Sequence, residues 1–268
     1  MDKNSNVVLI TGASTGIGKA CAEYLAAAGL RVYGTSRSAS AEPTPAGSYK
    51  MIKMDVTDAA SVDVAIKAII RDAGRIDAVL NNAGYHSVGP LEDVSVEELE
   101  KSYQTNCLGP MRVCKALIPI FRAQGGGRII NMSSVAGVVA VPFQSAYSGS
   151  KFALEGMTQV LRAEVRRFGI KVSVINPGDI RHQDCHNKTF KTEAYEPYFS
   201  QAMKVAWADE EKGYPPEKIG PLVKRILQSP KPRVRYYFGQ SGQAPTMWLK
   251  RHLPERLSEA IITDYYKA

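Results

Sequence analysis

Two side chains able to move a proton, Tyr147 and Lys151, lie four residues apart. The segment from Ser145 to about Phe168 has a helical pattern, so both side chains should project from one helix face, one turn apart. A phenol alone is a poor acid or base at neutral pH, because its unperturbed pKa is about 10. A neighbouring ammonium stabilises the phenolate and lowers that pKa toward the range where proton transfer at pH 7 is effective. The pair is therefore a candidate general acid/base.

A serine lies thirteen residues before this tyrosine, at the end of a predicted buried strand. Residues 128–132 form an apolar, β-favouring run, and Ser133 and Ser134 end it before a loop of small residues. From the strand end, Ser134 is placed to donate a hydrogen bond to a substrate oxygen. A Tyr-x-x-x-Lys spacing alone is common on helix surfaces, so the assignment depends on the other motifs of the chain.

A glycine-rich turn follows the first predicted strand, residues 7–10, and precedes a helix that continues to Ala28. The turn reads Thr11-Gly12-Ala13-Ser14-Thr15-Gly16-Ile17-Gly18. Glycines permit a tight turn and a close backbone approach to a pyrophosphate, and the helix N-terminus offers free N–H groups and a positive dipole end. The spacing G-x-x-x-G-x-G differs from the G-x-G-x-x-G of many dinucleotide folds. The sequence predicts a phosphate-binding turn here.

Strand and helix patterns alternate along the whole chain, which predicts one doubly wound α/β domain over residues 1–268. The expected sheet is mostly parallel and seven-stranded, with helices on both faces. Its strands are expected at residues 7–10, 31–37 (the second strand with its exit), 50–54, 78–80, 128–132, 171–175 and 233–238. Helices are expected after the glycine turn, from the Thr57-Asp58 cap to Ala73, from a capping box at 95–98 to Phe121, and at 145–168 and 216–228. The segment 38–48, rich in Ala, Pro, Ser and Gly, is expected to be a loop.

These motifs, with Asn81-Asn82-Ala83-Gly84 between them, resemble the short-chain dehydrogenase/reductase family from about residue 6 to residue 239. The resemblance implies four catalytic residues: Asn106, Ser134, Tyr147 and Lys151. Tyr147 would be the general acid/base, and Lys151 would lower its pKa and hold the nicotinamide ribose. Ser134 would orient the substrate oxygen. The main-chain carbonyl of Asn106 would hold a water that extends the proton path behind the lysine.

The resemblance also implies a set of cofactor-binding residues. The Asn82–Gly84 turn would pass beneath the cofactor, and Asp55 with Val56 would contact the adenine. The full set is Gly12, Ser14, Thr15, Gly16, Ile17, Gly18, Ser36, Arg37, Asp55, Val56, Asn82, Ala83, Gly84, Tyr147, Lys151, Pro177, Gly178 and Ile180.

The exit of the second strand indicates which cofactor is bound. NAD presents a ribose 2′-hydroxyl at this point, which is best met by a carboxylate. NADP presents a 2′-phosphate, which a carboxylate would repel and a guanidinium would bind with charge-assisted hydrogen bonds. Ser36 and Arg37 stand here, without an acidic residue. The sequence therefore predicts NADP(H) as the cofactor.

The substrate region departs from the family pattern at one position. Family members commonly have Pro-Gly-x-x-x-Thr after the sixth strand, and here His182 replaces the threonine that meets the nicotinamide carboxamide. A substrate lid is expected at about 183–213 and a C-terminal tail at about 240–268. The loops contain many apolar residues, which favour a medium or bulky carbonyl or alcohol substrate such as a steroid-like compound: Val88, Leu91, Val138, Val139, Val141, Phe143, Phe190, Tyr195 and Phe199.

Composition excludes several other classes of protein. Apolar residues at 44% and charged residues at 22% are ordinary for a soluble globular protein. Most of the net charge of +8 comes from residues 151–268, but it forms no long basic run or known nucleic-acid module. No signal segment, membrane span or metal-ligand cluster is evident. The four cysteines show no C-x-x-C spacing, so we expect them to be reduced thiols. We expect a cytoplasmic protein that binds no metal, nucleic acid or membrane.

The protein is expected to form a homo-oligomer, and other functions remain as alternatives. In the family, the helix with the Tyr–Lys pair and the helix with Asn106 commonly pack against a symmetry mate, which predicts a homodimer or homotetramer. The main alternative is a catalytically silent dinucleotide-binding protein, although the Ser, Tyr, Lys and Asn should not all survive in one. A nucleic-acid-binding protein is a weaker alternative. An epimerase or dehydratase relative would be longer and have a different glycine spacing.

Overall fold

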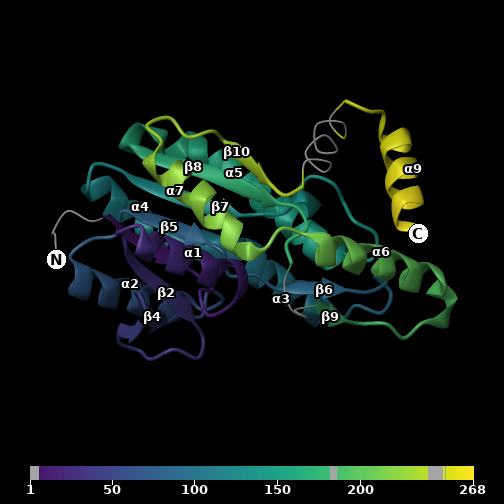
Figure 1. Ribbon diagram of the computed structural model, residues 1–268, viewed down its shortest axis with the longest axis horizontal. Coiled ribbons are helices and arrows are strands. Elements are labelled where there is room, and N and C mark those ends of the chain that lie inside the picture. Colours follow the sequence, from purple (N-terminus) through teal and green to yellow (C-terminus); the bar gives the residue numbers. More distant parts are fainter. Residues whose placement is uncertain (1–5, 182–185, 241–249, 251) are drawn as a thin grey trace.

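A computed structural model describes residues 6–181, 186–240, 250 and 252–268 (Figure 1). Its centre is an eight-stranded sheet with the order β10-β8-β7-β5-β1-β2-β4-β3. Seven strands are parallel, and only β3 runs antiparallel, against β4. The strands are β1 (Val7–Ile10), β2 (Arg31–Ser36), β3 (Thr44–Ala46), β4 (Tyr49–Lys53), β5 (Ala78–Asn81), β7 (Gly127–Met132), β8 (Ile170–Pro177) and β10 (Arg235–Phe238). The chain order reverses at β1, as in a doubly wound fold.

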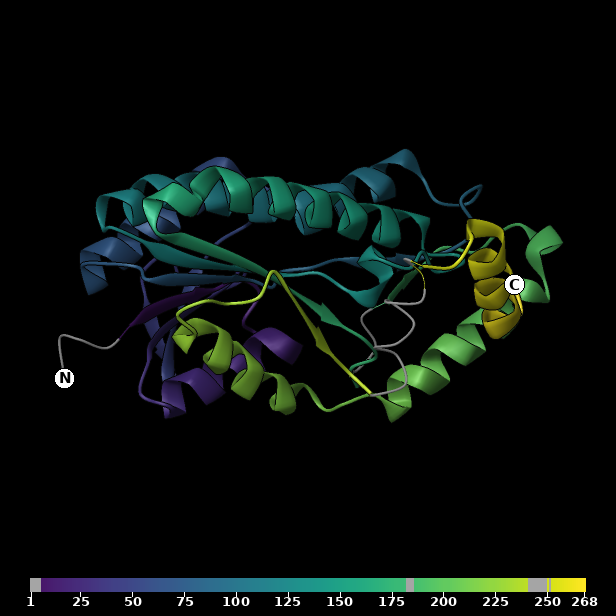
Figure 2. The ribbon, with the colours of Figure 1, turned by 90° about the horizontal axis from the view of Figure 1, so that it is seen from above.

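Helices cover both faces of this sheet, as Figure 2 shows. Along β1, Val7 and Leu9 contribute to one core cluster while Val8 and Ile10 contribute to the other, because successive strand side chains alternate in direction. The first cluster packs against α2 (Ala59–Ala73), α4 (Gly109–Ala123) and α5 (Ser145–Val165), and the second against α1 (Gly16–Ala27) and α7 (Gly220–Gln228). Burial on both faces explains why the central strands are almost continuously apolar.

The predicted fold class is confirmed, and the sheet has one strand more than predicted. The segment 38–48, expected to be a loop, contains β3, which pairs with β4 through Thr44, Pro45 and Ala46. Pro45 is tolerated because β3 is an edge strand, where a missing N–H need not break the ladder. Two predicted helices contain a 3₁₀ turn at one end: α5 continues into Arg166–Phe168, and α7 is preceded by Pro216–Ile219.

The long helix expected between residues 95 and 121 is interrupted. It begins, as predicted, at a Ser95 cap that accepts a hydrogen bond from the Glu98 N–H at 3.2 Å. It then runs as α3 (Val96–Tyr103), a π-helical turn at Gln104–Leu108, and α4. Pro110 has no N–H and cannot donate to the carbonyl four residues earlier, that of Asn106. The Gly109 N–H instead bonds to the carbonyl of Gln104, five residues earlier, which is the π pattern.

A second, small sheet joins the region after β5 to the predicted lid. Strand β6 (His86–Val88) pairs in parallel with β9 (His186–Lys188). A 3₁₀ turn (Glu193–Tyr195) and α6 (Tyr198–Lys212) follow, and the C-terminal helix α9 (Glu255–Tyr266) lies against α6 (Figures 1 and 2). The helix α9, in the described part of the expected tail, thus packs against α6 in the predicted lid.

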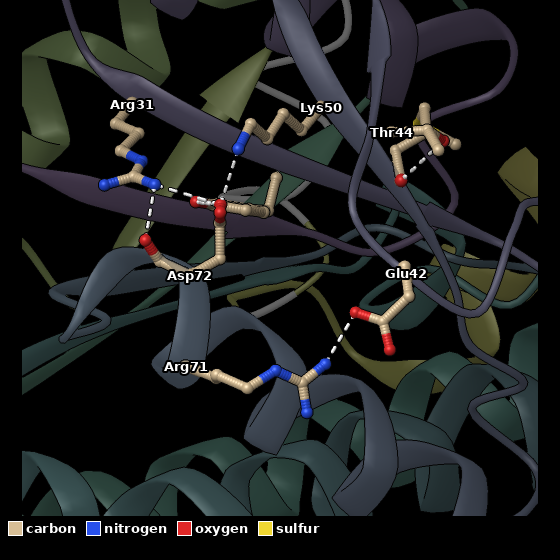
Figure 3. A network of polar contacts seen from close by, with 8 residues as sticks. Arg31, Glu42, Thr44, Lys50, Arg71 and Asp72 are labelled. Atoms are coloured by element: carbon tan, nitrogen blue, oxygen red, sulfur yellow. Dashed lines mark hydrogen bonds and ion pairs between the residues drawn. The ribbon is translucent and has the colours of Figure 1, made fainter.

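A charged network holds α2 against the amino ends of two strands (Figure 3). The carboxylate of Asp72 is 2.9 Å from Arg31 Nη2 and 2.7 Å from Lys50 Nζ, and it also accepts a hydrogen bond from the Tyr33 hydroxyl. Burial opposes ionisation of Asp72, but hydrogen bonds from Lys50 and Tyr33 lower its pKa to about 2. These contacts fix the last turn of α2 to the starts of β2 and β4.

Candidate active site

Several of the predicted site motifs follow the carboxyl ends of four adjacent strands. In the sheet order, β8, β7, β5 and β1 are neighbours, so the segments that follow them meet at one edge. Ser134 follows β7, Asn82 follows β5, the glycine turn follows β1, and Pro177 ends β8. The topology therefore brings together the motifs that the sequence singled out.

Tyr147 and Lys151 lie on the first turns of α5. Lys151 is only 4% exposed, and its Nζ donates a hydrogen bond to the carbonyl of Met132 at 2.8 Å. The same nitrogen is 5.6 Å from the centroid of the Tyr147 ring. Burial lowers the pKa of the Lys151 ammonium to about 8, against the opposing influences of Glu155 and Cys107. At pH 7 the side chain is still mostly a cation beside the phenol, as a general acid/base pair of this kind requires.

Ser134 is held by its backbone at the end of β7. Its Oγ accepts a hydrogen bond from the Ala136 N–H at 3.1 Å and caps a 3₁₀ turn, Val135–Gly137. Its carbonyl accepts a hydrogen bond from Asn176 Nδ2 at 2.8 Å. The half-buried hydroxyl thus stands on a fixed strand end in the same region as Tyr147.

Asn106 is fully buried inside the π-helical turn. Its Oδ1 accepts the Tyr85 N–H at 2.7 Å, and its Nδ2 donates to the Tyr85 carbonyl at 2.7 Å and to Ser150 Oγ at 3.0 Å. Ser150 in turn donates to the carbonyl of Tyr147 at 2.7 Å. The side chain therefore fastens the loop after β5 to the first turn of α5. Because Pro110 supplies no N–H, the main-chain carbonyl of Asn106 lacks the usual α-helical donor.

The glycine turn has the close contacts that a dinucleotide site needs. A Cβ on Gly18 would come within 2.1 Å of the Gly12 carbonyl oxygen, and Gly12 itself has a φ of 67°. Asn82 Nδ2 donates to the carbonyls of Thr11 and Gly12, both at 3.1 Å, while Thr11 Oγ1 accepts the Asn82 and Ala83 N–H groups. Gly84, which ends this motif, is exposed.

The start of α1 is open to a ligand. A Cβ on Gly16 would meet nothing within 4 Å, and Thr15 takes the N-cap position without a side-chain cap bond. Ser14 and Thr15 are exposed, and Ile17 is half-buried. The N–H groups of the first helical turn therefore face an open, positively polarised end, which fits a pyrophosphate.

The predicted adenosine end lies where β2 and β4 finish. Arg37 is exposed, Ser36 is half-buried and Val56 is buried. Asp55 Oδ1 accepts hydrogen bonds from the Thr57 N–H and hydroxyl at 2.9 and 2.7 Å. Burial opposes ionisation of Asp55, but these bonds and the charges of Arg37 and Arg112 hold the pKa of its carboxyl below the usual value. Arg37 is thus close enough to Asp55 to act on its carboxyl electrostatically.

The remaining predicted cofactor residues follow β8. Pro177 is buried, the Gly178 N–H donates to the carbonyl of Phe238 at 2.8 Å, and Ile180 forms an isolated bridge with Tyr214. His182 lies outside the described residues, so the structure does not place the predicted carboxamide contact.

Sequence reasoning missed His86, which lies beside the tyrosine. Its ring centroid is 4.1 Å from that of Tyr147, with an angle of 39° between the planes, and its Nε2 is 3.2 Å from Gln144 Oε1. His86 belongs to β6, and nothing in the local sequence marks it, because its place depends on the pairing of β6 with β9. The imidazole fixes one side of the phenol.

Many of the apolar residues expected in the substrate region gather between β6, the loop before α5 and the predicted lid. Phe143 contacts Tyr195 and Phe199 edge-on, and Phe190 stacks on Phe199 at 4.7 Å. Val88 and Phe199 are buried in this cluster. Leu91 is 60% exposed and is not part of it. Phe143 adopts a φ of 61°, a left-handed conformation rare for a bulky residue, directly before the helix that carries Tyr147.

Comparisons with known proteins show the family to which the chain belongs. The family model for short chain dehydrogenase matches residues 6–194. A 3-ketodihydrosphingosine reductase of Bacteroides thetaiotaomicron is 37% identical over 265 residues, covering 97% of each chain. The oxidoreductase BOA17 of Botryotinia fuckeliana is 32% identical over 246 residues, covering 88% of this chain and 89% of the other. A crystal structure of a short-chain dehydrogenase from Streptomyces avermitilis has a TM-score of 0.82 at 29% identity, covering 100% of this chain and 98% of that one.

The fold and the glycine turn define a Rossmann-type dinucleotide-binding protein. The chain belongs to the short-chain dehydrogenase/reductase family and is an oxidoreductase. This family binds a nicotinamide dinucleotide, and the open start of α1 fits one. Within the described ranges, no helix is long and apolar enough to cross a membrane, and no three metal-ligating side chains gather.

Proposed function

We propose that the protein interconverts a ketone or aldehyde and a secondary alcohol with NADP(H), using Tyr147 as the general acid/base. The observation that carries this proposal is the Lys151 ammonium, buried to 4% exposure and 5.6 Å from the centre of the Tyr147 ring. A cation is costly to bury, so a lysine kept beside a phenol at the carboxyl edge of the sheet indicates proton chemistry.

Each residue has a distinct part in the proposed reaction. A bound nicotinamide cofactor supplies or accepts the hydride. Tyr147 gives its hydroxyl proton to the carbonyl oxygen during reduction, and Lys151 stabilises the phenolate that remains. Ser134 donates a hydrogen bond that orients the substrate oxygen. Asn106 holds the loop after β5 in place, and its main-chain carbonyl would hold a water behind Lys151.

The substrate is proposed to be a medium or bulky apolar carbonyl compound. Support comes from the aromatic cluster of Phe143, Phe190, Tyr195 and Phe199 beside the reacting side chains. The name of the Bacteroides relative also specifies a keto substrate, on dihydrosphingosine. Steroid-like hydroxy and keto compounds are the second class that such a surface favours. The segment at about 183–213 is proposed to be the substrate lid, and the location is proposed to be cytoplasmic.

A substrate panel with a tyrosine variant tests the function. NADPH oxidation is followed with 3-ketodihydrosphingosine, ketosteroids, quinones, simple ketones and aldehydes. We expect turnover with at least one of these compounds. In the Tyr147→Phe variant, kcat should fall at least ~10²-fold because the acid is lost, while NADPH binding, followed by fluorescence, is retained.

Two outcomes would contradict the proposal. Turnover by Tyr147→Phe near the wild-type rate would remove Tyr147 from the chemistry. Binding of NADPH without oxidation by any compound of the panel would favour the alternative, a catalytically silent dinucleotide-binding protein.

A further inference from the structure

A buried carboxylate lies one helical turn beyond the lysine of the proposed site. Glu155 follows Lys151 by four residues on α5 and is 4% exposed. Its Oε1 accepts a hydrogen bond from Asn176 Nδ2 at 2.6 Å, and its Oε2 accepts one from Arg235 Nη2 at 2.5 Å. Arg235 is at the start of the edge strand β10 and is one-fifth exposed. Three elements, α5, β8 and β10, therefore converge on one carboxylate.

Asn176 connects this carboxylate to the strand end that carries Ser134. It is fully buried at the end of β8, and its Nδ2 also donates to the Ser134 carbonyl at 2.8 Å. Both contacts are with oxygen acceptors, so the amide nitrogen must face them, because the opposite orientation would set oxygen against oxygen. The result is a continuous chain of hydrogen bonds from Arg235 through Glu155 and Asn176 to Ser134.

The geometry of α5 shows which elements this row of hydrogen bonds connects. Tyr147, Lys151 and Glu155 are spaced by four residues and lie along one helix face. Lys151 Nζ binds the carbonyl of Met132, and Glu155 acts through Asn176 on the carbonyl of Ser134, two residues later. The helix that carries the acid is thus fixed at two points to the strand that carries the serine.

We propose that Glu155, Asn176 and Arg235 are positioning residues, which set Ser134 relative to Tyr147 and place a negative charge one helical turn from the Lys151 ammonium. The inference rests on the proposed function of that site. A contribution to stability does not by itself explain the buried Glu155–Arg235 ion pair, since such a pair can often be replaced by apolar residues of similar volume without loss of stability. The Glu155 carboxylate is connected to Ser134 through Asn176 and lies one helical turn from Lys151, so its charge can influence the proposed reaction.

The electrostatic half of this role involves a small number of groups. Lys151 faces Tyr147 and Glu155 on its own helix, Cys107 from the π-helical turn, and the Met132 carbonyl from β7. Glu155 faces Asn176 from β8 and Arg235 from β10. Burial favours the neutral amine of Lys151, and the charge of Glu155 opposes that tendency. Arg235 partly neutralises Glu155, so the two residues act on Lys151 in opposite directions.

The test measures Lys151 directly, without turnover. The pH dependence of trace acylation of Lys151 by acetic anhydride, read by mass spectrometry, gives the midpoint at which its amine loses the proton. Glu155→Gln preserves the shape and an acceptor for Asn176 but removes the charge, so the midpoint should fall by about one pH unit. Arg235→Met should raise it, and Arg235→Lys should leave it near the wild-type value. Glu164→Gln, an exposed change on the same helix, is the control and should have no effect.

Kinetics with a substrate of the protein test the geometric half. Glu155→Gln and Arg235→Met should lower kcat roughly ten- to a hundredfold through misplacement of Ser134, with little change in the KM for NADPH from Arg235→Met. Midpoints that stay at the wild-type value in both variants would overturn the electrostatic role. Unchanged kcat in both variants, with only a lower Tm, would reduce the network to a structural one. If no substrate is turned over at all, the proposed function fails, and the acylation midpoints still decide the influence on Lys151.

Discussion

At the scale of single residues, the buried ammonium of Lys151 has a cost that the rest of the molecule must offset. Its folded pKa, about 8, is below the unfolded value of about 10.4, so folding favours the neutral amine. Below pH 8 the protonated side chain therefore reduces stability, and this reduction is lost as the pH rises through 8 toward 10.4. The proposed site keeps the Lys151 ammonium near neutral pH although this charge lowers the stability of the fold.

Arg37 tests the predicted cofactor choice at the same scale. The side chain is exposed at the exit of β2, where no carboxylate competes for the ribose. A charge-assisted hydrogen bond to the 2′-phosphate is worth about 1.5–3 kcal/mol, or roughly ten- to a hundredfold in affinity. Arg37→Ala should therefore raise the KM for NADPH by about this factor and change the KM for NADH little. Steady-state kinetics with both cofactors make the comparison.

Lys53 provides a matched control for this change, because it is an exposed cation at the end of the neighbouring strand β4. Lys53→Ala should leave the ratio of the two KM values unaltered. Equal use of NADH and NADPH by the wild type would show that Arg37 does not select the cofactor.

At the scale of elements, one aspartate attaches the proposed lid to the body of the protein, through Lys191 and Thr192. Asp93 accepts hydrogen bonds from the Lys191 N–H at 2.7 Å, the Thr192 N–H at 3.0 Å and the Thr192 hydroxyl at 2.6 Å. The hydrogen bonds from Thr192, offset by a small desolvation effect and aided by Lys191, hold the pKa of Asp93 below its usual value. Asp93, nearly a hundred positions earlier in the chain, thus fixes the backbone between Phe190 and Tyr195 of the aromatic cluster.

Removal of this attachment should affect substrate more than cofactor. Asp93→Ala removes all three hydrogen bonds, so we expect a several-fold higher KM for the carbonyl substrate and an unchanged Kd for NADPH, measured by fluorescence. Thr192→Val removes one of the three bonds and should have a smaller effect in the same direction. A substrate KM that is the same in Asp93→Ala and the wild type would argue against a substrate lid that Asp93 holds in place.

The network around Asp72 predicts how the molecule responds to acid. The folded pKa of about 2 is below the unfolded value of about 3.9, so Asp72 adds stability above pH 4, and this contribution is lost as the pH falls toward 2. The side chain is 31% exposed, and after allowance for screening the contribution is about 1 kcal/mol. Asp72→Asn should lower the free energy of unfolding by this amount at pH 7, and the difference should shrink below pH 4, as urea titrations would measure.

The ion pair of Asp264 with Lys267, at 3.0 Å, offers a control on the surface of α9. Its carboxylate side chain is 82% exposed, so Asp264→Asn should change stability little at either pH. An equal effect of the two substitutions would mean that burial of the Asp72 network does not matter.

At the scale of the whole molecule, α5 leaves apolar side chains in solvent. Phe152, Met157 and Val160 are 43%, 39% and 58% exposed, and all three lie on the helix that carries Tyr147. Isolated exposed apolar residues are normal, but several on one helix indicate a surface that another chain covers. Together with the family resemblance, this supports the proposal of a homodimer or homotetramer with a two-fold axis.

A charge placed on this face should separate the copies. Val160→Glu would bury an unpaired carboxylate in a two-fold contact twice over, so the mass from light scattering should fall toward the 29.2 kDa of one chain. Val64→Glu is the matched control, since Val64 on α2 is equally exposed at 59%. A wild-type protein that is monomeric at micromolar concentration would contradict the proposed assembly.

The fold class and most of the proposed site could be predicted from the sequence. Apolar strands such as residues 7–10 alternate with helical segments, and the carboxyl ends of parallel strands meet at one edge, so residues of the glycine turn, Asn82, Ser134 and Tyr147 had to converge. The Tyr147–Lys151 pair follows from helix geometry alone. These inferences depend on local spacing and on topology, and both can be read along the chain.

The features that depend on contacts between distant parts of the chain became visible only in the folded protein. Strand β3 exists because β4 provides an edge for it, and His86 reaches Tyr147 because β6 pairs with β9, a hundred residues later. The π-helical turn at Asn106 combines the local effect of Pro110 with a contact to the backbone of Tyr85. Arg235, eighty residues from Glu155, becomes its partner only through the register of β10 on β8. Such pairs are fixed by the packing of the whole chain, so no local pattern encodes them.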